Sequence, residues 1–332
     1  MTYEALQKDL KAGKFKPVYL LEGEEDFFID QISSFFEHRL LSDTEKEFNL
    51  NIFYGRDADW SEVLNACRRY PMFSDRQVVM VKEAQSMKTL DKLMGYLDNP
   101  LKSTILVVTY KHGKLDGKTK LKKAFEKCGP VLSTKRLYDN KIPDWIKEYA
   151  GGLGHDITPR ACMLLTDHIG SDLSRQANEI DKLLLNLPAG KKIDEDDIEL
   201  YVGISKEYNV FEFQKALGAK DMVKVIRIMN YFADNPKAAP LTMLVMILYG
   251  FFSKVYAIVH LPAKPDRELA SLLKVHPFFV TDYVKAARIY RRQGAERALL
   301  ILHEYNLRSI GVGDAGTPDA GLLKEMVMKM VH

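Results

Sequence analysis

The residues with the clearest potential for chemistry lie in the stretch EGEEDFFID, where a short apolar run meets a helix-like pattern. Ligands of open parallel sheets bind beyond the carboxyl ends of the strands, so a nucleotide would bind at this turn. A phosphate loop needs GxxxxGK[ST], whose backbone N–H groups and lysine hold the phosphates. Here Gly23 is the only glycine and no lysine follows it. Four carboxylates would repel phosphate: Glu22, Glu24, Glu25 and Asp26. We therefore expect no phosphate binding at this turn and no nucleotide cofactor.

Other residues with catalytic or metal-binding potential also lack a functional arrangement. The strand ending VVMVKEA offers Lys82 and Glu83 where a magnesium-binding Asp-Glu pair would be expected. The eight histidines form no HxxH or HExxH set, and no serine is flanked by glycines as in a nucleophile elbow. Three cysteines are widely separated: Cys67, Cys128 and Cys162. Their spacing excludes a disulfide framework and argues against a zinc site, so we expect neither a catalytic site nor a metal.

Composition bounds the class of protein. The 332 residues are 46% hydrophobic and 28% charged, which is ordinary globular composition and suggests two or three domains. The net charge of +3 permits contact with nucleic acid but does not indicate a dedicated nucleic-acid-binding protein. The amphipathic start MTYEALQKDLKAGKFKP has no signal-peptide core. The most apolar run, APLTMLVMILYGFFSKVYAIVHL, is interrupted by Lys254 and His260, and its fully apolar part is shorter than the ~20 residues of a membrane span. We interpret it as a buried helix, and we expect a cytoplasmic protein with no membrane partner.

Apolar runs alternate with helical patterns from residue 17 to about residue 137. Strands are predicted at 17–23, 48–55, 77–84, 104–110 and 130–136, and helices at 24–41, 59–70, 88–99 and 118–128. The runs VVMV and ILVV are apolar on both faces, as is typical of central strands of a parallel sheet covered by helices. The alternation predicts an α/β domain over 1–138 with right-handed crossovers.

The strand patterns stop after this domain. Residues 139–205 read as a small helical domain, whose segments begin at a cap or first-turn proline and end at glycine. Residues 206–332 continue as apolar-periodic helices separated by short polar joints, including two helices over 278–292 and 294–311. The sequence therefore predicts an α/β domain followed by two helical domains.

The stretch RRYPMFSDRQVVMVKEA places two large apolar side chains at a predicted helix-to-strand turn. Met72 and Phe73 follow a proline and are bounded by Arg69 on one side and Asp75 and Arg76 on the other. Exposing both to water is unfavourable, so they either pack into the domain core or bind something outside the molecule. The residues alone favour the core and leave the second interpretation open.

Four motifs in this order resemble the delta-subunit family of bacterial DNA polymerase III: YLLEGEEDFFID, PMFSDRQVVMVKEA, LDGKTKLKKAFEKCGPVL and GSDLSRQANEIDKLLL. The resemblance covers nearly the whole chain and is least distinctive in the C-terminal third. It implies an AAA+-type fold without a functional phosphate loop over 1–138, a lid domain over 139–205 and a helical collar domain over 206–332. It also implies partners: the sliding clamp (beta subunit), the ATP-hydrolysing tau/gamma subunits and the delta-prime subunit of the clamp loader.

Carried over residue by residue, the resemblance assigns clamp binding to the hydrophobic pair that precedes the strand beginning Arg-Gln, which here is Met72 and Phe73. Leucine is usual at the first position, and the flexible thioether of Met72 also fills an apolar pocket well. With the resemblance, the exposed interpretation is favoured over the core. The neighbouring Pro71, Arg76 and Gln77 are predicted to position the pair. The predicted function is to bind and open the clamp for loading onto primed DNA, as an accessory subunit of a DNA-directed DNA polymerase with no catalytic site of its own.

The segment KHGKLDGKTKLKKAFEK concentrates seven lysines against Asp116 and Glu126. A solvated loop and helix is the default interpretation of such a run. The alternative is a face for DNA or an acidic partner. Its candidate residues are Lys118, Lys120, Lys122 and Lys123.

Two alternatives from other classes stay open at this point. An ATP-hydrolysing AAA+ enzyme with a degenerate loop would bind ATP with micromolar affinity. A stand-alone DNA-binding protein would bind DNA tightly and with strong salt dependence, which the small net charge disfavours.

Overall fold

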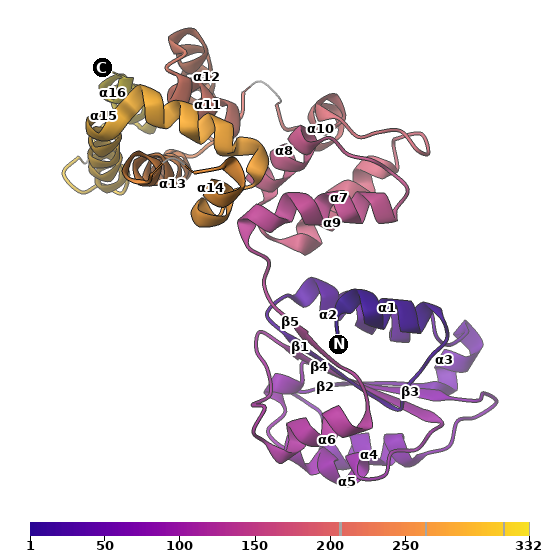
Figure 1. The fold of residues 1–332 in the computed structure, drawn as a ribbon. Helices are drawn as coiled ribbons and strands as arrows, with labels where there is room; N and C mark the ends of the chain where they lie inside the picture. Colours follow the sequence, from indigo (N-terminus) through magenta and orange to yellow (C-terminus); the bar gives the residue numbers. More distant parts are fainter. Residues whose placement is uncertain (206–207, 263, 315, 332) are drawn as a thin grey trace. The chain divides into compact units, whose positions relative to one another are not determined.

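The computed structural model describes residues 1–205, 208–262, 264–314 and 316–331. The chain divides into two compact units, Met1–Leu137 and Tyr138–His332. The first is the α/β unit and the second the helical unit (Figure 1). The predicted separation of 139–205 from 206–332 stays a prediction, and residues 206 and 207 at that joint lie outside the described residues.

The α/β unit is a parallel sheet between two layers of helices (Figure 1). All five predicted strands are confirmed: β1 (Val18–Gly23), β2 (Leu50–Tyr54), β3 (Gln77–Lys82), β4 (Thr104–Lys111) and β5 (Val131–Thr134). Helices α1 (Tyr3–Lys11) and α2 (Asp26–His38) cover one face, and α4 (Trp60–Arg68), α5 (Met94–Leu97) and α6 (Lys120–Cys128) cover the other. Along β1, Tyr19 and Leu21 pack with α1 and α2, whereas Val18 and Leu20 pack toward α4–α6. The strands read as continuously apolar because both faces are covered.

Two helices of this unit were not predicted, and one predicted helix is largely absent. Helix α1 forms from the amphipathic start of the chain. Helix α3 (Asp43–Asn49) begins at a capping box in which the Ser42 and Glu45 side chains bond each other's backbone N–H. The predicted helix over 88–99 is instead a 3-10 turn (Leu90–Leu93) followed by the single turn of α5. No side chain caps the start of either short segment.

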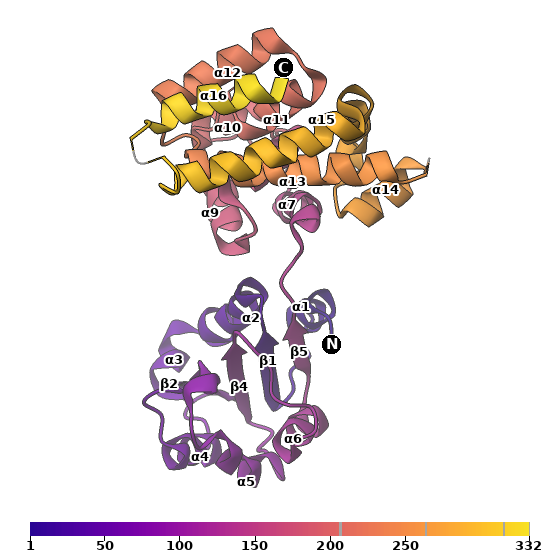
Figure 2. The same ribbon diagram turned by 90° about the vertical axis from the view of Figure 1, so that its left-hand side faces the viewer.

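The helical unit contains ten α-helices among its described residues (Figure 2). They are α7 (Ile142–Gly152), α8 (Pro159–Ile169), α9 (Leu173–Leu184), α10 (Glu195–Val202), α11 (Val210–Ala219), α12 (Met222–Asp234), α13 (Leu241–His260), α14 (Asp266–Leu273), α15 (Val280–Ser309) and α16 (Asp319–Val331). The predicted pair of helices over 278–311 forms one run, α15, which is broken at Arg291 by a left-handed residue with φ 49°. A single large core joins α11–α16.

Helix α13 is long and apolar enough to cross a membrane by length and composition alone, and the core helix of a globular protein passes the same test. One face of α13, including Leu244, Leu248, Phe252 and Val255, is buried in the core of the helical unit. Met246 and Tyr249 on its other side are exposed. The packing supports the interpretation of this apolar run as a core helix.

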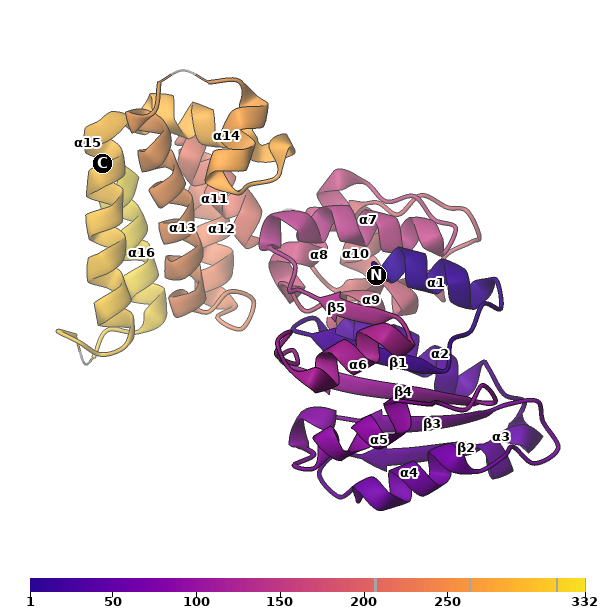
Figure 3. The same ribbon diagram turned by 60° about the horizontal axis from the view of Figure 1, so that its bottom comes forward.

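The strand order β2-β3-β4-β1-β5 places β1 between β4 and β5 (Figure 3). All four pairings are parallel, with Val18 opposite Leu106 and Leu20 opposite Val131. The connection from β1 runs to the far edge of the sheet, and the connection from β4 passes over β1 to β5. Their helices, α2 and α6, therefore lie on opposite faces and leave the carboxyl end of β1 between them.

A buried ion pair joins α6 to this end of β1. Glu22 is 1% exposed and Lys122 5%, and the Lys122 ammonium donates to the Glu22 carboxylate. The Ser133 hydroxyl donates to the same carboxylate at 2.7 Å, and the Leu115 N–H donates to its second oxygen at 3.1 Å. Both charges are removed from water, so each depends on the other for compensation. The pair thereby fixes the loop before α6 against the sheet.

We predict that Lys122→Met destabilises the α/β unit because it leaves the Glu22 carboxylate buried without its cation. The expected loss is ~3–5 kcal/mol in the free energy of unfolding. Chemical denaturation followed by tryptophan fluorescence measures it. The chain has two tryptophans, Trp60 in the α/β unit and Trp145 in the helical unit, so a Trp145→Phe background makes the signal report the α/β unit alone.

The matched control is Lys123→Met, which removes an exposed lysine from the same helix and should change stability by less than ~0.5 kcal/mol. The double variant Glu22→Gln/Lys122→Met should recover part of the loss, since it leaves no buried charge. Equal stability of Lys122→Met and Lys123→Met would contradict the assigned role of the pair.

Candidate protein-interaction site

Met72 and Phe73 lie on the surface, in the turn between α4 and β3. Phe73 is 91% exposed and Met72 54%, and Tyr70 beside them is also exposed. The structure thus excludes the interpretation in which both side chains pack into the core of the α/β unit. Large apolar side chains grouped on a surface are typical of sites that bind another macromolecule.

The backbone at Phe73 is held in an unfavourable conformation. Its φ of 55° lies in the left-handed region, which costs a non-glycine residue roughly 1–2 kcal/mol. Such a conformation persists only when the surrounding structure enforces it. The contacts on both sides of Phe73 are therefore informative.

On one side the turn is held by α3. Asn49 is 1% exposed, and its Nδ2 donates to the carbonyl oxygen of Met72 at 2.9 Å. The Met72 N–H donates back to Asn49 Oδ1 at 2.8 Å. One turn earlier in α3, hydrogen bonds from Ser42 and then Ser74 lower the pKa of the Glu45 carboxyl to about 2. Helix α3 thus contacts the residues immediately before and after Phe73.

On the other side the turn is held by the start of β3. Gln77 is 2% exposed, and its Nε2 lies 3.0 Å from the carbonyl oxygen of Ala66 and 2.6 Å from that of Arg69. The same nitrogen lies 2.8 Å from Thr104 Oγ1. Gln77 therefore ties the end of α4 to β3 from within the unit, and its side chain is not available to a partner.

The remaining predicted members of the site lie beside the pair. The Arg76 guanidinium lies 4.8 Å from the centre of the Phe15 ring, and Pro71 is half-buried at the start of the turn. The sequence motif did not indicate Asn49 or Glu45. Both lie on α3, a helix that was not predicted, and they contact the turn from there. The Ser42-x-x-Glu45 capping signature was the available signal for that helix.

The first strand-to-helix turn is closed against β5. Gly23 has a φ of 142°, and a Cβ atom at this position would lie 2.1 Å from Thr134 Oγ1. The Glu25 N–H donates to Thr134 Oγ1 at 3.2 Å, and the Glu24 N–H donates to the Thr134 carbonyl oxygen at 3.4 Å. In a phosphate loop such N–H groups face the phosphates, but here they already have protein partners.

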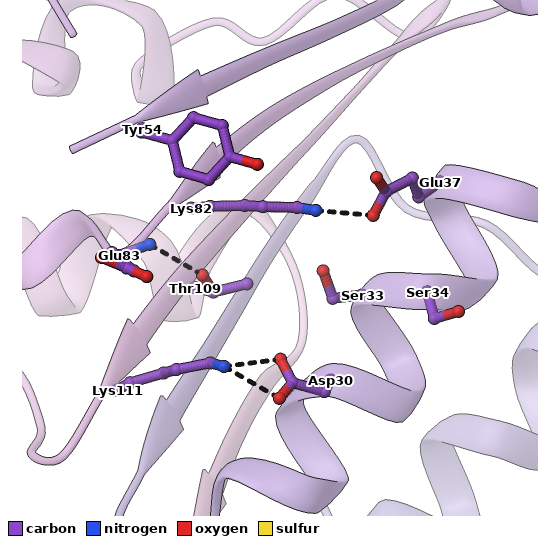
Figure 4. A pocket seen from close by; sticks show the side chains of 9 residues that line it. All are labelled: Asp30, Ser33, Ser34, Glu37, Tyr54, Lys82, Glu83, Thr109 and Lys111. Atoms are coloured by element: carbon purple, nitrogen blue, oxygen red, sulfur yellow. Dashed lines mark hydrogen bonds and ion pairs between the residues drawn. The ribbon is translucent and has the colours of Figure 1, made fainter. Parts of the chain in front are cut away.

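A polar cavity of about 290 Å³ lies at the carboxyl ends of β2, β3 and β4 (Figure 4). Its two lysines are paired with carboxylates from α2: Lys82 Nζ lies 2.6 Å from Glu37, and Lys111 Nζ lies 2.7 Å from Asp30. These pairs tie α2 to the sheet and leave no uncompensated cation for a phosphate. Among the described residues, no group of three histidine, cysteine or acidic side chains could hold a metal ion. The lining residues are Asp30, Ser33, Ser34, Glu37, Tyr54, Lys82, Glu83, Thr109 and Lys111.

Three of the four lysines predicted to face DNA or an acidic partner lie on the surface. Lys118, Lys120 and Lys123 are exposed. Including Lys122 in this face was wrong, because its ammonium is buried against Glu22 and cannot reach DNA or a partner. Lys122 lies on the inward side of α6 with Leu121 and Phe125, so helical geometry turns it away from its exposed neighbours.

Known proteins are similar to this chain in sequence and in fold. Residues 19–135 match the family model for the delta subunit of DNA polymerase III. DNA polymerase III subunit delta of Bacillus subtilis (strain 168) is 25% identical over 337 residues, covering 97% of this chain and 94% of its own. The solved structure of the Bacillus subtilis DNA clamp loader delta protein (YqeN) covers 99% of both chains with a TM-score of 0.59 and 22% identity.

The structural likeness confirms the predicted fold, a parallel α/β sheet followed by a helical C-terminal region. The matched range contains the closed first turn, the exposed pair Met72 and Phe73, and the α3 residues that hold them. Residues 19–135 thus match the family model for the delta subunit of DNA polymerase III, and the chain is similar over nearly its whole length to a delta subunit of Bacillus subtilis.

Proposed function

We propose that this chain is the clamp loader subunit that binds the sliding clamp and opens it for loading onto primed DNA. The observation that carries the proposal is the exposed pair Met72 and Phe73 on a turn held from both sides. The match to the delta-subunit family model and the likeness to a solved structure named as a DNA clamp loader delta protein support it. The closed first turn supports a role in which this chain hydrolyses no ATP itself.

The turn is suited to anchor-in-pocket binding. Full burial of a side chain of this size stabilises a complex by roughly 1.5–3 kcal/mol, and a few central anchors dominate most interfaces. Asp75 and Arg76 flank the pair and supply a polar rim of the kind that surrounds apolar anchors. Because the turn is already ordered, little conformational entropy is lost when the anchors bind.

Opening of the clamp follows from differential binding. An anchor that fits the opened clamp interface better than the closed one shifts the population of rings toward the open form. The shift is limited to the difference between the two affinities. The chain thus acts through binding free energy, and release after loading is assigned to ATP hydrolysis by the neighbouring subunits.

The helical unit is the proposed site of assembly with the tau/gamma and delta-prime subunits. Met246 and Leu300 are each 70% exposed and line an apolar groove of about 450 Å³ between α13 and α15. Exposed apolar residues on this scale suit a unit that packs against neighbouring subunits. The exposed Lys118, Lys120 and Lys123 remain the proposed face toward DNA or an acidic partner.

We predict that Met72→Ala/Phe73→Ala weakens binding to the bacterial sliding clamp at least ~100-fold, because both anchors are removed. Surface plasmon resonance with immobilised clamp measures the affinity. A fluorophore–quencher pair across one clamp interface reports opening in the same samples, and opening should fall with binding.

Two controls bracket this experiment. Met72→Leu keeps an apolar anchor of similar volume and should retain parental affinity within a few-fold. Leu185→Ala removes an apolar side chain that is 86% exposed in the helical unit and should leave clamp binding unchanged. Equal binding by the parent and the double alanine variant would refute the proposed site.

We also predict that the purified chain shows no ATP binding up to millimolar concentration, since the first-turn N–H groups bond β5 and the cavity lysines are paired. Isothermal titration calorimetry tests this. Micromolar affinity for ATP would favour the ATP-hydrolysing alternative. Tight, strongly salt-dependent binding of the chain alone to DNA would instead favour a stand-alone DNA-binding protein.

A further inference from the structure

We propose that Asn49 is a positioning residue that holds the Met72–Phe73 turn in its binding conformation before the clamp arrives. This inference rests on the proposed function. Its structural basis is the reciprocal pair of hydrogen bonds between the Asn49 amide and the backbone of Met72, at 2.9 and 2.8 Å. The amide uses one donor and one acceptor, as a neighbouring strand would.

The position of Asn49 explains why a side chain takes this role. Strand β2 starts at Leu50, which is paired with Val78 of β3, so the backbone ladder begins only after Asn49. Met72 precedes β3 by five residues and lies outside the ladder. Asn49 extends the contact between the two segments beyond the sheet. Its 1% exposure keeps water from competing for these hydrogen bonds.

A second contact from the same helix completes the arrangement. Glu45 and Asn49 are four residues apart and therefore lie on one face of α3. The Asn49 Nδ2 also donates to the Glu45 carbonyl oxygen at 3.1 Å, which fixes the orientation of the amide. The Ser74 side chain also interacts with the Glu45 carboxyl and helps to lower its pKa. One turn of α3 thus contacts the residues on either side of Phe73, which has a left-handed conformation and is 91% exposed.

The functional consequence is preorganisation. Without these contacts the residues around Phe73 would return to ordinary backbone conformations, and the clamp would have to order them on binding. Ordering the backbone of one to two residues on binding corresponds to a loss of roughly tenfold to 100-fold in affinity. Asn49 itself need not touch the clamp for this effect.

The first test examines the free chain, without any clamp. In Asn49→Ala, the Met72 N–H loses its acceptor, so its hydrogen–deuterium exchange should accelerate at least ~tenfold. The amide of Val79 within β3 should exchange at the parental rate, which shows that the sheet is intact. Asn235→Ala is the matched control, because Asn235 also donates from its side chain to a backbone carbonyl, at the exposed end of α12.

The second test measures clamp affinity. Asn49→Ala should bind roughly tenfold to 100-fold more weakly than the parent. Asn49→Asp keeps the acceptor for the Met72 N–H but sets a carboxyl oxygen against the carbonyl oxygens of Met72 and Glu45, so it should weaken binding at least as much as Asn49→Ala. Ser74→Ala removes the side chain that interacts with Glu45, at a half-buried position, and should weaken binding to a smaller extent.

A double-variant cycle separates positioning from general destabilisation. In a Met72→Ala/Phe73→Ala background, Asn49→Ala should change the residual affinity by less than ~threefold, because neither anchor is left to position. A merely structural role would give the same loss in both backgrounds and would overturn the inference, as would unchanged Met72 exchange in Asn49→Ala.

The outcomes also separate this inference from the proposed function. If Phe73→Ala abolishes clamp binding but Asn49→Ala leaves it at parental strength, the proposed function stands and the positioning role is refuted. If the parent chain does not bind the clamp, the proposed function falls, and with it the predicted effect of Asn49 on clamp affinity. The exchange data would then still decide whether Asn49 holds the turn.

Discussion

The pairing of β5 with β1 determines what the α/β unit can do. It places Thr134 against Gly23, where the side-chain and backbone oxygens of the threonine take the N–H groups of the first turn. The same pairing brings Ser133 to the buried Glu22–Lys122 pair. The carboxyl end of β1, which in an open sheet is the natural place for a ligand, is therefore filled by the protein itself. This end of β1 therefore offers no open ligand site, and its contacts with β5 make this edge of the sheet rigid.

That rigidity matters because the proposed function uses surface shape and not bond chemistry. An anchor can shift a partner between two conformations only if the anchor keeps its own conformation on binding. Lysine–carboxylate pairs tie α2 to β3 and β4, Gln77 ties α4 to β3, and α3 holds the exposed turn. The lysine pairs lie at the carboxyl ends of β3 and β4, whereas Gln77 and α3 act at the start of β3, beside the turn.

Most of the fold could be predicted from the sequence because its strands are apolar on both faces and its long helices have a clear period. The predictions failed where a local pattern was weak or a partner was distant. Helix α3 has only seven residues, and its capping box was the signal that was missed. Lys122 was assigned to the exposed lysine face because of its charge alone. Its spacing of three residues from Phe125 places it on the buried side of α6. The hydrogen bonds between Asn49 and Met72 could not be predicted, because 23 residues separate the two and neither residue type indicates such a contact. No propensity predicts a phenylalanine with positive φ; only the assembled surroundings impose it.

The left-handed backbone of Phe73 also defines what a small molecule or peptide would need in order to imitate this turn. A linear peptide copied from the turn would carry both anchors, but it would lack α3 and would relax to right-handed or extended backbone. In the protein, one turn of a short helix constrains this backbone. A mimic would need a covalent constraint instead, such as a ring closed across the positions of Met72 and Ser74. In this respect the proposed recognition element depends on residues that are distant in the chain, although its two anchors are adjacent.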